Sequence, residues 1–209
     1  MKIIKIIYCF VLLSSWSAIG LCQEGLNIGL NARTSSLGGA YDAGIFDIET
    51  IYHNPAAISN ITKREIGMTS GFSADGWASQ NLSYGHPFRY GTLGAGISFD
   101  YGNYSDLTGI VGFGFPIFKD SFQKTKVGGA GINLKLIKSS SKDHRSEVIS
   151  TDVGFLYNLL IRKINFGFSI RNIGTKYEIL EKKKKIPLEF VVGFSYRDIA
   201  DRLSLILNT

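Results

Sequence analysis

Two kinds of residue alternate along most of the chain after residue 62, and this alternation is the strongest constraint on the fold. From Leu93 to Tyr101 every second residue is apolar, while glycine, serine and aspartate occupy the positions between them. A period of two places successive side chains on opposite faces of a β-strand. The stretch therefore predicts a strand with one apolar face and one face of small or polar residues.

The same alternation recurs along the rest of the chain. Clear or weaker versions occupy Ile66 to Phe72, Leu82 to Phe88, Val111 to Ile117, Ala130 to Leu136, Val153 to Ile161, Ile164 to Arg171 and Leu188 to Arg197, and Leu203 to Leu207 begins another. Short alternating runs separated by polar connections indicate antiparallel strands, about nine in all. The pattern predicts an all-β, antiparallel, up-and-down arrangement.

The face opposite the apolar one decides which all-β class is expected. In a water-soluble sandwich this face is rich in lysine, glutamate and threonine, but here glycine, serine and asparagine predominate. Aromatic residues also recur near the predicted strand ends, at Tyr90, Tyr101, Phe118, Tyr157, Tyr177 and Tyr196. A lipid-facing apolar side, a polar interior and aromatic girdles are typical of a transmembrane β-barrel. A secreted β-sandwich is the alternative, since its strands alternate as well.

Residues 1–22 are expected to be a signal peptide. Two lysines precede an apolar run from Ile6 to Leu13, and small residues follow up to Gly20. This run is shorter than the ~20 residues that a membrane-spanning helix needs. Both cysteines, Cys9 and Cys22, lie within this leader, so no disulfide is predicted in the mature chain.

Residues 23–62 interrupt the alternation and are expected to form a compact plug. A run of small residues lets one backbone approach another closely. Further on, a proline with fixed φ pushes the preceding asparagine out of the helical region and predicts a turn. The two motifs are Leu37, Gly38, Gly39, Ala40 and Tyr41, and Asn54, Pro55 and Ala56.

These two motifs resemble the N-terminal signature of the PorV/PorQ family of outer-membrane β-barrels, which is related to the FadL fatty-acid transporters. In that family the Asn-Pro-Ala box sits in a hatch inside the barrel. A second likeness lies in residues 152–197, where an Arg-Asn-x-Gly turn and a proline-initiated strand recur at Arg171, Asn172, Gly174 and Pro187. The resemblance implies an outer-membrane barrel with an N-terminal plug and about fourteen strands.

The strand count differs from what the resemblance implies. About nine predicted strands are fewer than about fourteen, and bacterial single-chain barrels have an even number. We therefore expect residues 63–209 to be the first part of a longer barrel, with its C-terminal part missing. A complete small barrel of about eight strands is the alternative.

The polar linkers between predicted strands differ in length. Two of the long ones, Lys138 to Glu147 and Thr175 to Lys185, are expected to be loops on the same, outer side. The lysine run Lys182 to Lys185 is expected to be a solvated part of the second loop.

The resemblance implies an accessory role in type IX protein secretion, in which the barrel holds or shuttles secreted cargo. Its partners would be outer-membrane lipid, secreted proteins and components of the secretion machinery. The alternative is FadL-like passive uptake of a hydrophobic small molecule, which would need an apolar pocket between plug and wall. A third reading is a purely structural barrel or secreted β domain without a ligand.

The sequence predicts neither an enzyme nor a cofactor. The three histidines, His53, His86 and His144, lack metal-ligand spacing. An acidic group in the plug, Asp42, Asp47 and Glu49, is expected to be a turn rather than a cation site. A net charge of +6 without a basic, aromatic stripe does not indicate nucleic-acid binding.

Overall fold

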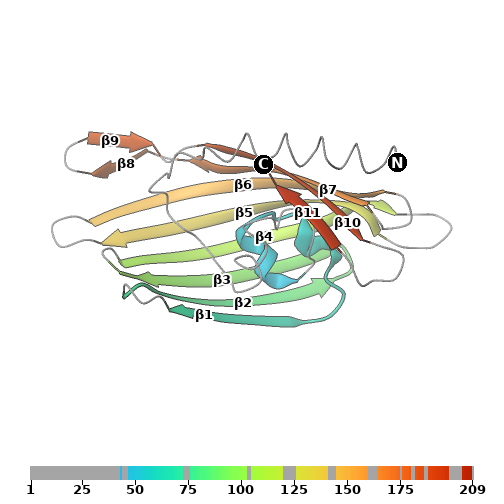
Figure 1. Ribbon diagram of the computed structural model, residues 1–209, viewed down its shortest axis with the longest axis horizontal. Coiled ribbons are helices and arrows are strands. Elements are labelled where there is room, and N and C mark those ends of the chain that lie inside the picture. Colours follow the sequence, from blue (N-terminus) through green and yellow to red (C-terminus); the bar gives the residue numbers. More distant parts are fainter. Residues whose placement is uncertain are drawn as a thin grey trace, which may run out of the picture.

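A computed structural model describes Ala43 and residues 47–72, 76–102, 105–119, 126–140, 145–159, 164–174, 176–179, 182–185, 188–197 and 204–208. Nine of the strands form one open antiparallel sheet in simple up-and-down order (Figure 1). The all-β, up-and-down fold predicted from the alternation is thereby confirmed. The signal peptide, Asp42, His144, Pro187 and the motif Leu37 to Tyr41 lie outside the described residues.

The strands of the main sheet follow the predicted segments closely. They are β1 (Glu65–Phe72), β2 (Ala78–Phe88), β3 (Gly91–Tyr101), β4 (Ser105–Lys119), β5 (Lys126–Ser140), β6 (Arg145–Leu159), β7 (Ile164–Gly174), β10 (Glu189–Arg197) and β11 (Ser204–Asn208). Each predicted alternating run lies largely within one of these strands. Among the described strands, β1 and β11 each pair on one side only.

Two polar segments that were predicted to be loops contain strands instead. Strand β5 continues to Ser140 and β6 begins at Arg145, so most of the predicted loop from Lys138 to Glu147 belongs to the sheet. The second predicted loop holds a separate hairpin of β8 (Lys176–Ile179) and β9 (Lys182–Lys185). Both were missed because charged residues replace the apolar alternation there. The C-terminal ends of β5 and β7 do lie at the same end of the sheet, as expected.

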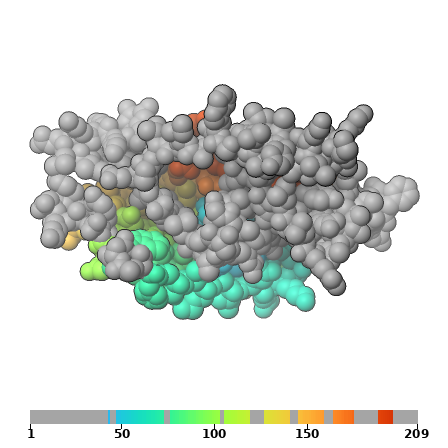
Figure 2. Space-filling model, in the orientation of Figure 1, coloured from blue at the N-terminus to red at the C-terminus, as the bar shows by residue number. Residues whose placement is uncertain are grey.

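The two faces of the sheet differ in the way that the sequence predicted. Large apolar side chains lie on the outer face and are exposed, with Ile66, Met68 and Phe72 of β1 each at least 75% exposed. Figure 2 shows β1, in green, along the lower margin of the molecule. Serine, threonine, asparagine and single charged residues face inward and are buried. The described residues contain no second sheet packed on the apolar face, as a β-sandwich would require.

Two short 3-10 helices lie against the inner face of the sheet (Figure 1). They are η1 (Ile48–Tyr52) and η2 (Ala57–Asn60). Asp47 caps η1 by accepting a hydrogen bond from the backbone N–H of Glu49 at 3.1 Å. No helix in the described part of the chain is long and apolar enough to cross a bilayer.

Candidate functional site

The described part of the plug, Ala43 and residues 47–61, fills the space against the inner face. Ile51, Ala56 and Ile58 have no exposed surface. The main apolar cluster of the described residues consists of Ile48, Ile51, Tyr52, Ile58 and Ile61 from the plug and Ile110 from β4. The core therefore lies between plug and sheet, and we take this interface as the candidate functional site.

Tyr52 connects the plug to two neighbouring strands. Its hydroxyl lies 3.1 Å from the carbonyl oxygen of Leu82 in β2 and 3.2 Å from that of Ile97 in β3. Burial raises the pKa of the Tyr52 phenol, and the carboxylates of Glu49 and Asp100 raise it further. The hydroxyl is therefore protonated at neutral pH and available as a donor.

Asn54 of the predicted Asn-Pro-Ala box contacts both the plug and the inner face of the sheet, which we call the wall. Its Oδ1 atom accepts a hydrogen bond from the backbone N–H of Ala56 at 3.0 Å, which stabilises the predicted turn. Its Nδ2 atom donates to the carbonyl oxygen of Phe155 in β6 at 3.3 Å. From the wall, Asn133 Nδ2 donates to the carbonyl oxygen of Ile51 at 2.5 Å. Side-chain amides thus join two backbones in a site that excludes water.

Several inward glycines of the wall are needed for this close contact. A Cβ atom on Gly94 would lie 2.8 Å from Ile51 Cδ1, and one on Gly114 would lie 2.6 Å from Ile58 Cγ1. A Cβ atom on Gly131 would overlap the backbone of Pro55. These positions carry glycine because the plug occupies the volume that a side chain would take.

A buried polar cluster adjoins the plug on β5, β6 and β7. Lys135 Nζ lies 2.9 Å from Asp152 Oδ1 and donates to Asn172 Oδ1 at 2.9 Å. The backbone N–H of Asn172 in turn donates to Asp152 Oδ1 at 2.9 Å. Beside it, Arg171 Nε donates to the carbonyl oxygen of His53 at 2.7 Å. Lys135 and Asp152 thereby neutralise each other, and Arg171 holds the plug backbone at His53, between η1 and η2.

The motif at Arg171, Asn172 and Gly174 is not the turn that the sequence predicted, because all three residues belong to β7. The pairing with β6 shifts register between Thr151 and Val153, and Asn172 has a φ of 61°. A non-glycine residue in the left-handed region, opposite an irregular register, is typical of a β-bulge. The bulge directs Arg171 and Asn172 toward the plug and the buried cluster.

Only some of the predicted site residues come together in the described structure. Asn54, Pro55 and Ala56 are buried against the inner face of the sheet. Arg171 donates a hydrogen bond to the carbonyl oxygen of His53, the residue before Asn54. Gly174 pairs with Ser150 at the far end of β7. Sequence reasoning missed Asn133, Lys135 and Asp152 as functional residues. The available signal was that large polar residues stand at inward positions where glycine and serine otherwise predominate.

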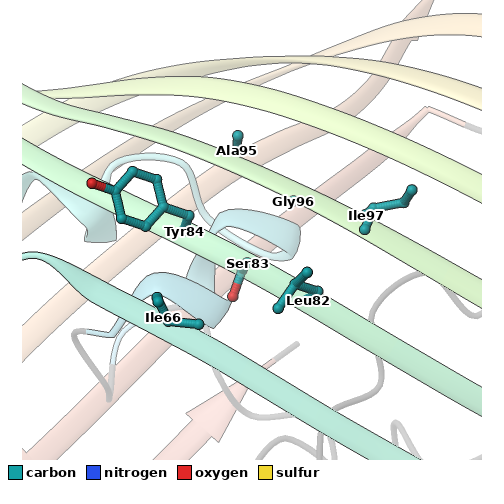
Figure 3. A pocket seen from close by; sticks show the side chains of 7 residues that line it. All are labelled: Ile66, Leu82, Ser83, Tyr84, Ala95, Gly96 and Ile97. Atoms are coloured by element: carbon teal, nitrogen blue, oxygen red, sulfur yellow. The ribbon is translucent and has the colours of Figure 1, made fainter.

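A shallow hollow of about 440 Å³ lies away from this interface, on the outer face of β1, β2 and β3. Figure 3 shows its lining residues, which are Ile66, Leu82, Ser83, Tyr84, Ala95, Gly96 and Ile97. Most of these side chains are apolar and exposed. The hollow therefore belongs to the apolar outer surface and is not the pocket between plug and wall that an uptake function would need.

The described residues contain no group of three or more His, Cys, Asp or Glu side chains placed to hold a metal ion. The acidic residue Glu49 of the plug accepts a hydrogen bond from Thr69 Oγ1 of β1 at 2.7 Å. Comparison of the chain with protein-family models, with curated proteins and with solved structures finds no match.

Proposed function

We propose that this protein is an outer-membrane β-barrel of the PorV/PorQ type, with the described sheet as part of its wall and the N-terminal segment as its plug. The proposal depends on one observation. The usual relation between polarity and burial is reversed, because apolar side chains are exposed on one face of the sheet and polar side chains are buried on the other. Outward apolar side chains are up to 76% exposed, whereas inward polar ones such as Ser98 and Lys135 are at most 2% exposed. Exposed apolar surface of this extent marks contact with a membrane or a partner.

The size of the apolar face supports contact with a bilayer. Strands β2, β3 and β7 have 11 residues each, and a tilted transmembrane strand needs ~9–11 residues. On β5 and β6 the apolar face ends at a charged row, where Lys138 and Glu147 form an exposed ion pair at 2.9 Å. A charged boundary is what an apolar band of limited height requires.

Aromatic residues lie near both ends of this band. At one end, Phe88 stacks on Phe113 with ring centroids 5.6 Å apart. At the other end, the exposed Tyr101 of β3 pairs with Ala78 of β2, and Ala78 pairs in turn with the exposed Phe72 of β1. The two aromatic side chains therefore lie in one row across the three strands. Aromatic girdles at the two water interfaces are a property of outer-membrane barrels.

Two connections support an orientation of the proposed barrel, although the six-residue β4–β5 connection lies at the same end of the sheet as the tight β2–β3 connection. The plug leads into β1 at the end of the sheet where the tight β2–β3 connection also lies. The β8–β9 hairpin leaves from the opposite end. Short connections face the periplasm and long ones the exterior in such barrels. In this proposal, further strand pairing at β1 and β11 closes the barrel and removes both open edges.

Within this framework we favour the accessory role in type IX secretion over uptake. A hydrophobic small molecule would have to pass between the described part of the plug, in which Ile51, Ala56 and Ile58 have no exposed surface, and a sheet face lined by Ser, Asn, Asp and Lys. Such a wall is a poor environment for an apolar ligand. A plug that packs this tightly against the sheet leaves the rim and the outer segments as the surface for protein cargo.

The proposal has two tests that separate its parts. Fractionation should find the protein in the outer membrane with heat-modifiable mobility in gels, and a soluble periplasmic product would contradict the membrane assignment. In a deletion strain, secreted proteins should lose their surface attachment while fatty-acid uptake is unchanged. Reduced uptake with normal surface attachment would instead support the FadL-like alternative.

A further inference from the structure

The hollow on the outer face of β1, β2 and β3 exists because one small side chain stands among large ones. Ala95 of β3 pairs with Tyr84 on one side and with Val111 on the other. On its own strand it stands between Leu93 and Ile97, which are both exposed on the same face. Ala95 is exposed and smaller than all four neighbours. The apolar surface therefore has a depression of about 440 Å³ at this point instead of a level row of side chains.

Polar groups gather at one end of the hollow. Tyr84 lines it, and Figure 3 shows the Tyr84 hydroxyl on the side away from Leu82 and Ile97. This hydroxyl lies 3.1 Å from Nδ1 of His86, which is two residues further along β2. When Tyr84 donates to Nδ1, the neutral imidazole carries its proton on Nε2 and can donate it to a ligand.

A guanidinium group lies at the same end. Glu65 pairs with Gly85, so Arg64, the residue before Glu65, lies level with His86. Two positions along a strand correspond to ~7 Å, and this is the spacing from Ile66 in the hollow back to Arg64. Arg64 is exposed, and the described residues give it no ion-pair partner.

The charges around this end favour an anionic ligand. Lys63 and Arg64 are exposed immediately before β1, and Arg89 is exposed at the β2–β3 connection. The nearby carboxylate of Glu65 accepts a hydrogen bond from the backbone N–H of Ile48 in the plug at 3.2 Å. It is therefore turned to the inner face, while the three cations remain at the surface.

From this combination we propose that the hollow and the polar groups beside it bind one anionic glycerophospholipid. An acyl chain lies in the depression over Ala95, and the phosphate accepts hydrogen bonds from Arg64 and His86. Guanidinium and phosphate form strong, charge-assisted hydrogen bonds, and basic residues at a membrane surface attract anionic lipids. The inference rests on the proposed function, in which this end of the sheet faces the periplasmic leaflet, where the lipids are glycerophospholipids.

Lipid selectivity separates a specific site from general contact with a bilayer. The purified full chain in detergent micelles is titrated with phosphatidylglycerol or with phosphatidylcholine, and the retained lipids are counted by native mass spectrometry. The chain should retain one phosphatidylglycerol molecule, with at least fivefold weaker retention of phosphatidylcholine. Equal retention of the two lipids would overturn the site.

Matched variants decide whether the named residues form it. Ala95→Leu fills the depression but keeps the face apolar, and it should reduce phosphatidylglycerol retention at least fivefold. Arg64→Gln should abolish the preference for phosphatidylglycerol over phosphatidylcholine. Two controls should bind as the wild type does. They are Ala130→Leu, which makes the same change opposite the exposed Phe115 on β5, and Lys138→Gln, which removes an exposed cation at the other end of the sheet.

Wild-type retention by Ala95→Leu, or an equal loss in Ala130→Leu, would overturn the site, since retention would then reflect the apolar face in general. If Ala95→Leu does not fold, the lipid preference of Arg64→Gln decides, because this residue lies outside the paired strands. Failure of the site leaves the membrane assignment intact when the chain still fractionates with the outer membrane. A soluble periplasmic chain would instead contradict the proposed function itself.

Discussion

The Nζ atom of Lys135 lies 2.9 Å from Asp152 Oδ1, and the two side chains are 2% and 0% exposed. The pair joins neighbouring strands β5 and β6 on the inner face, and Lys135 also donates to Asn172, the residue after Arg171, which bonds the plug at His53. A second ion pair between the same strands, Lys138 with Glu147, has the same 2.9 Å separation but is 50% and 66% exposed. The chain therefore offers an internal comparison of a buried and an exposed pair.

Removing one partner of the buried pair should destabilise the fold strongly. Lys135→Met leaves the Asp152 carboxylate without its cation, a change that typically costs ~3–5 kcal/mol. Lys138→Met at the exposed pair should cost less than ~1 kcal/mol. Denaturant unfolding of both variants measures the difference, and equal losses would show that the Lys135 pair does not organise the interior.

The inward glycines should not tolerate even a methyl group where the plug touches them. Gly131→Ala makes a Cβ atom overlap the backbone of Pro55, which cannot give way as the end of a flexible side chain can, and it should cost ~1–3 kcal/mol by overpacking. The matched control is Gly109→Ala in β4, because a Cβ atom there meets nothing within 4 Å. Unfolding midpoints and protease sensitivity near residue 50 measure the effect. A Gly131→Ala variant as stable and as protease-resistant as the control would argue against a tightly seated plug.

The stabilising contribution of the Tyr52 hydroxyl should depend on pH. Burial raises the pKa of the phenol above its ordinary value of 10.0, so the folded chain holds this proton more tightly than the unfolded chain. The contribution is therefore complete below about pH 10 and declines as the pH rises further. Tyr52→Phe should lose ~1–2 kcal/mol at neutral pH, and the gap to wild type should narrow above about pH 10. A gap that is constant across this range would contradict the buried, hydrogen-bonded hydroxyl.

A charge on the outer face distinguishes a membrane wall from a water-exposed one. Leu134 of β5 is 58% exposed, lies between Ile132 and Leu136 on the outer face of its strand, and has Val111 and Thr151 as its cross-strand neighbours. Leu134→Arg should destabilise a barrel folded in lipid by ~2–4 kcal/mol, whereas a surface substitution in water changes stability by ~0.5 kcal/mol or less. Folding into vesicles measures the cost. The control is Ser140→Arg, at the charged end of the same strand, and a harmless Leu134→Arg variant would count against the membrane proposal.

The strands of the main sheet and the division of their faces were predictable from the sequence. Each depends on residues two positions apart, so Leu93 and Ile97 identify the outer face of β3 without reference to any other strand. The β8–β9 hairpin was not predictable in this way, because the lysines of β9 carry no alternation. The turn at Asn54 was also local, since its side chain bonds Ala56 only two residues on.

What holds the plug in place was decided by tertiary structure alone. Arg171 and His53 are 118 residues apart in the chain, Asn54 and Phe155 are 101 apart, and Ser195 and Ala43 are 152 apart. The sequence determined that small and polar residues would line one face, because that follows from a period of two. Which of them contact the plug and which pair with each other depends on strand order, register and the bulge at Asn172. These features arise only when distant strands pair.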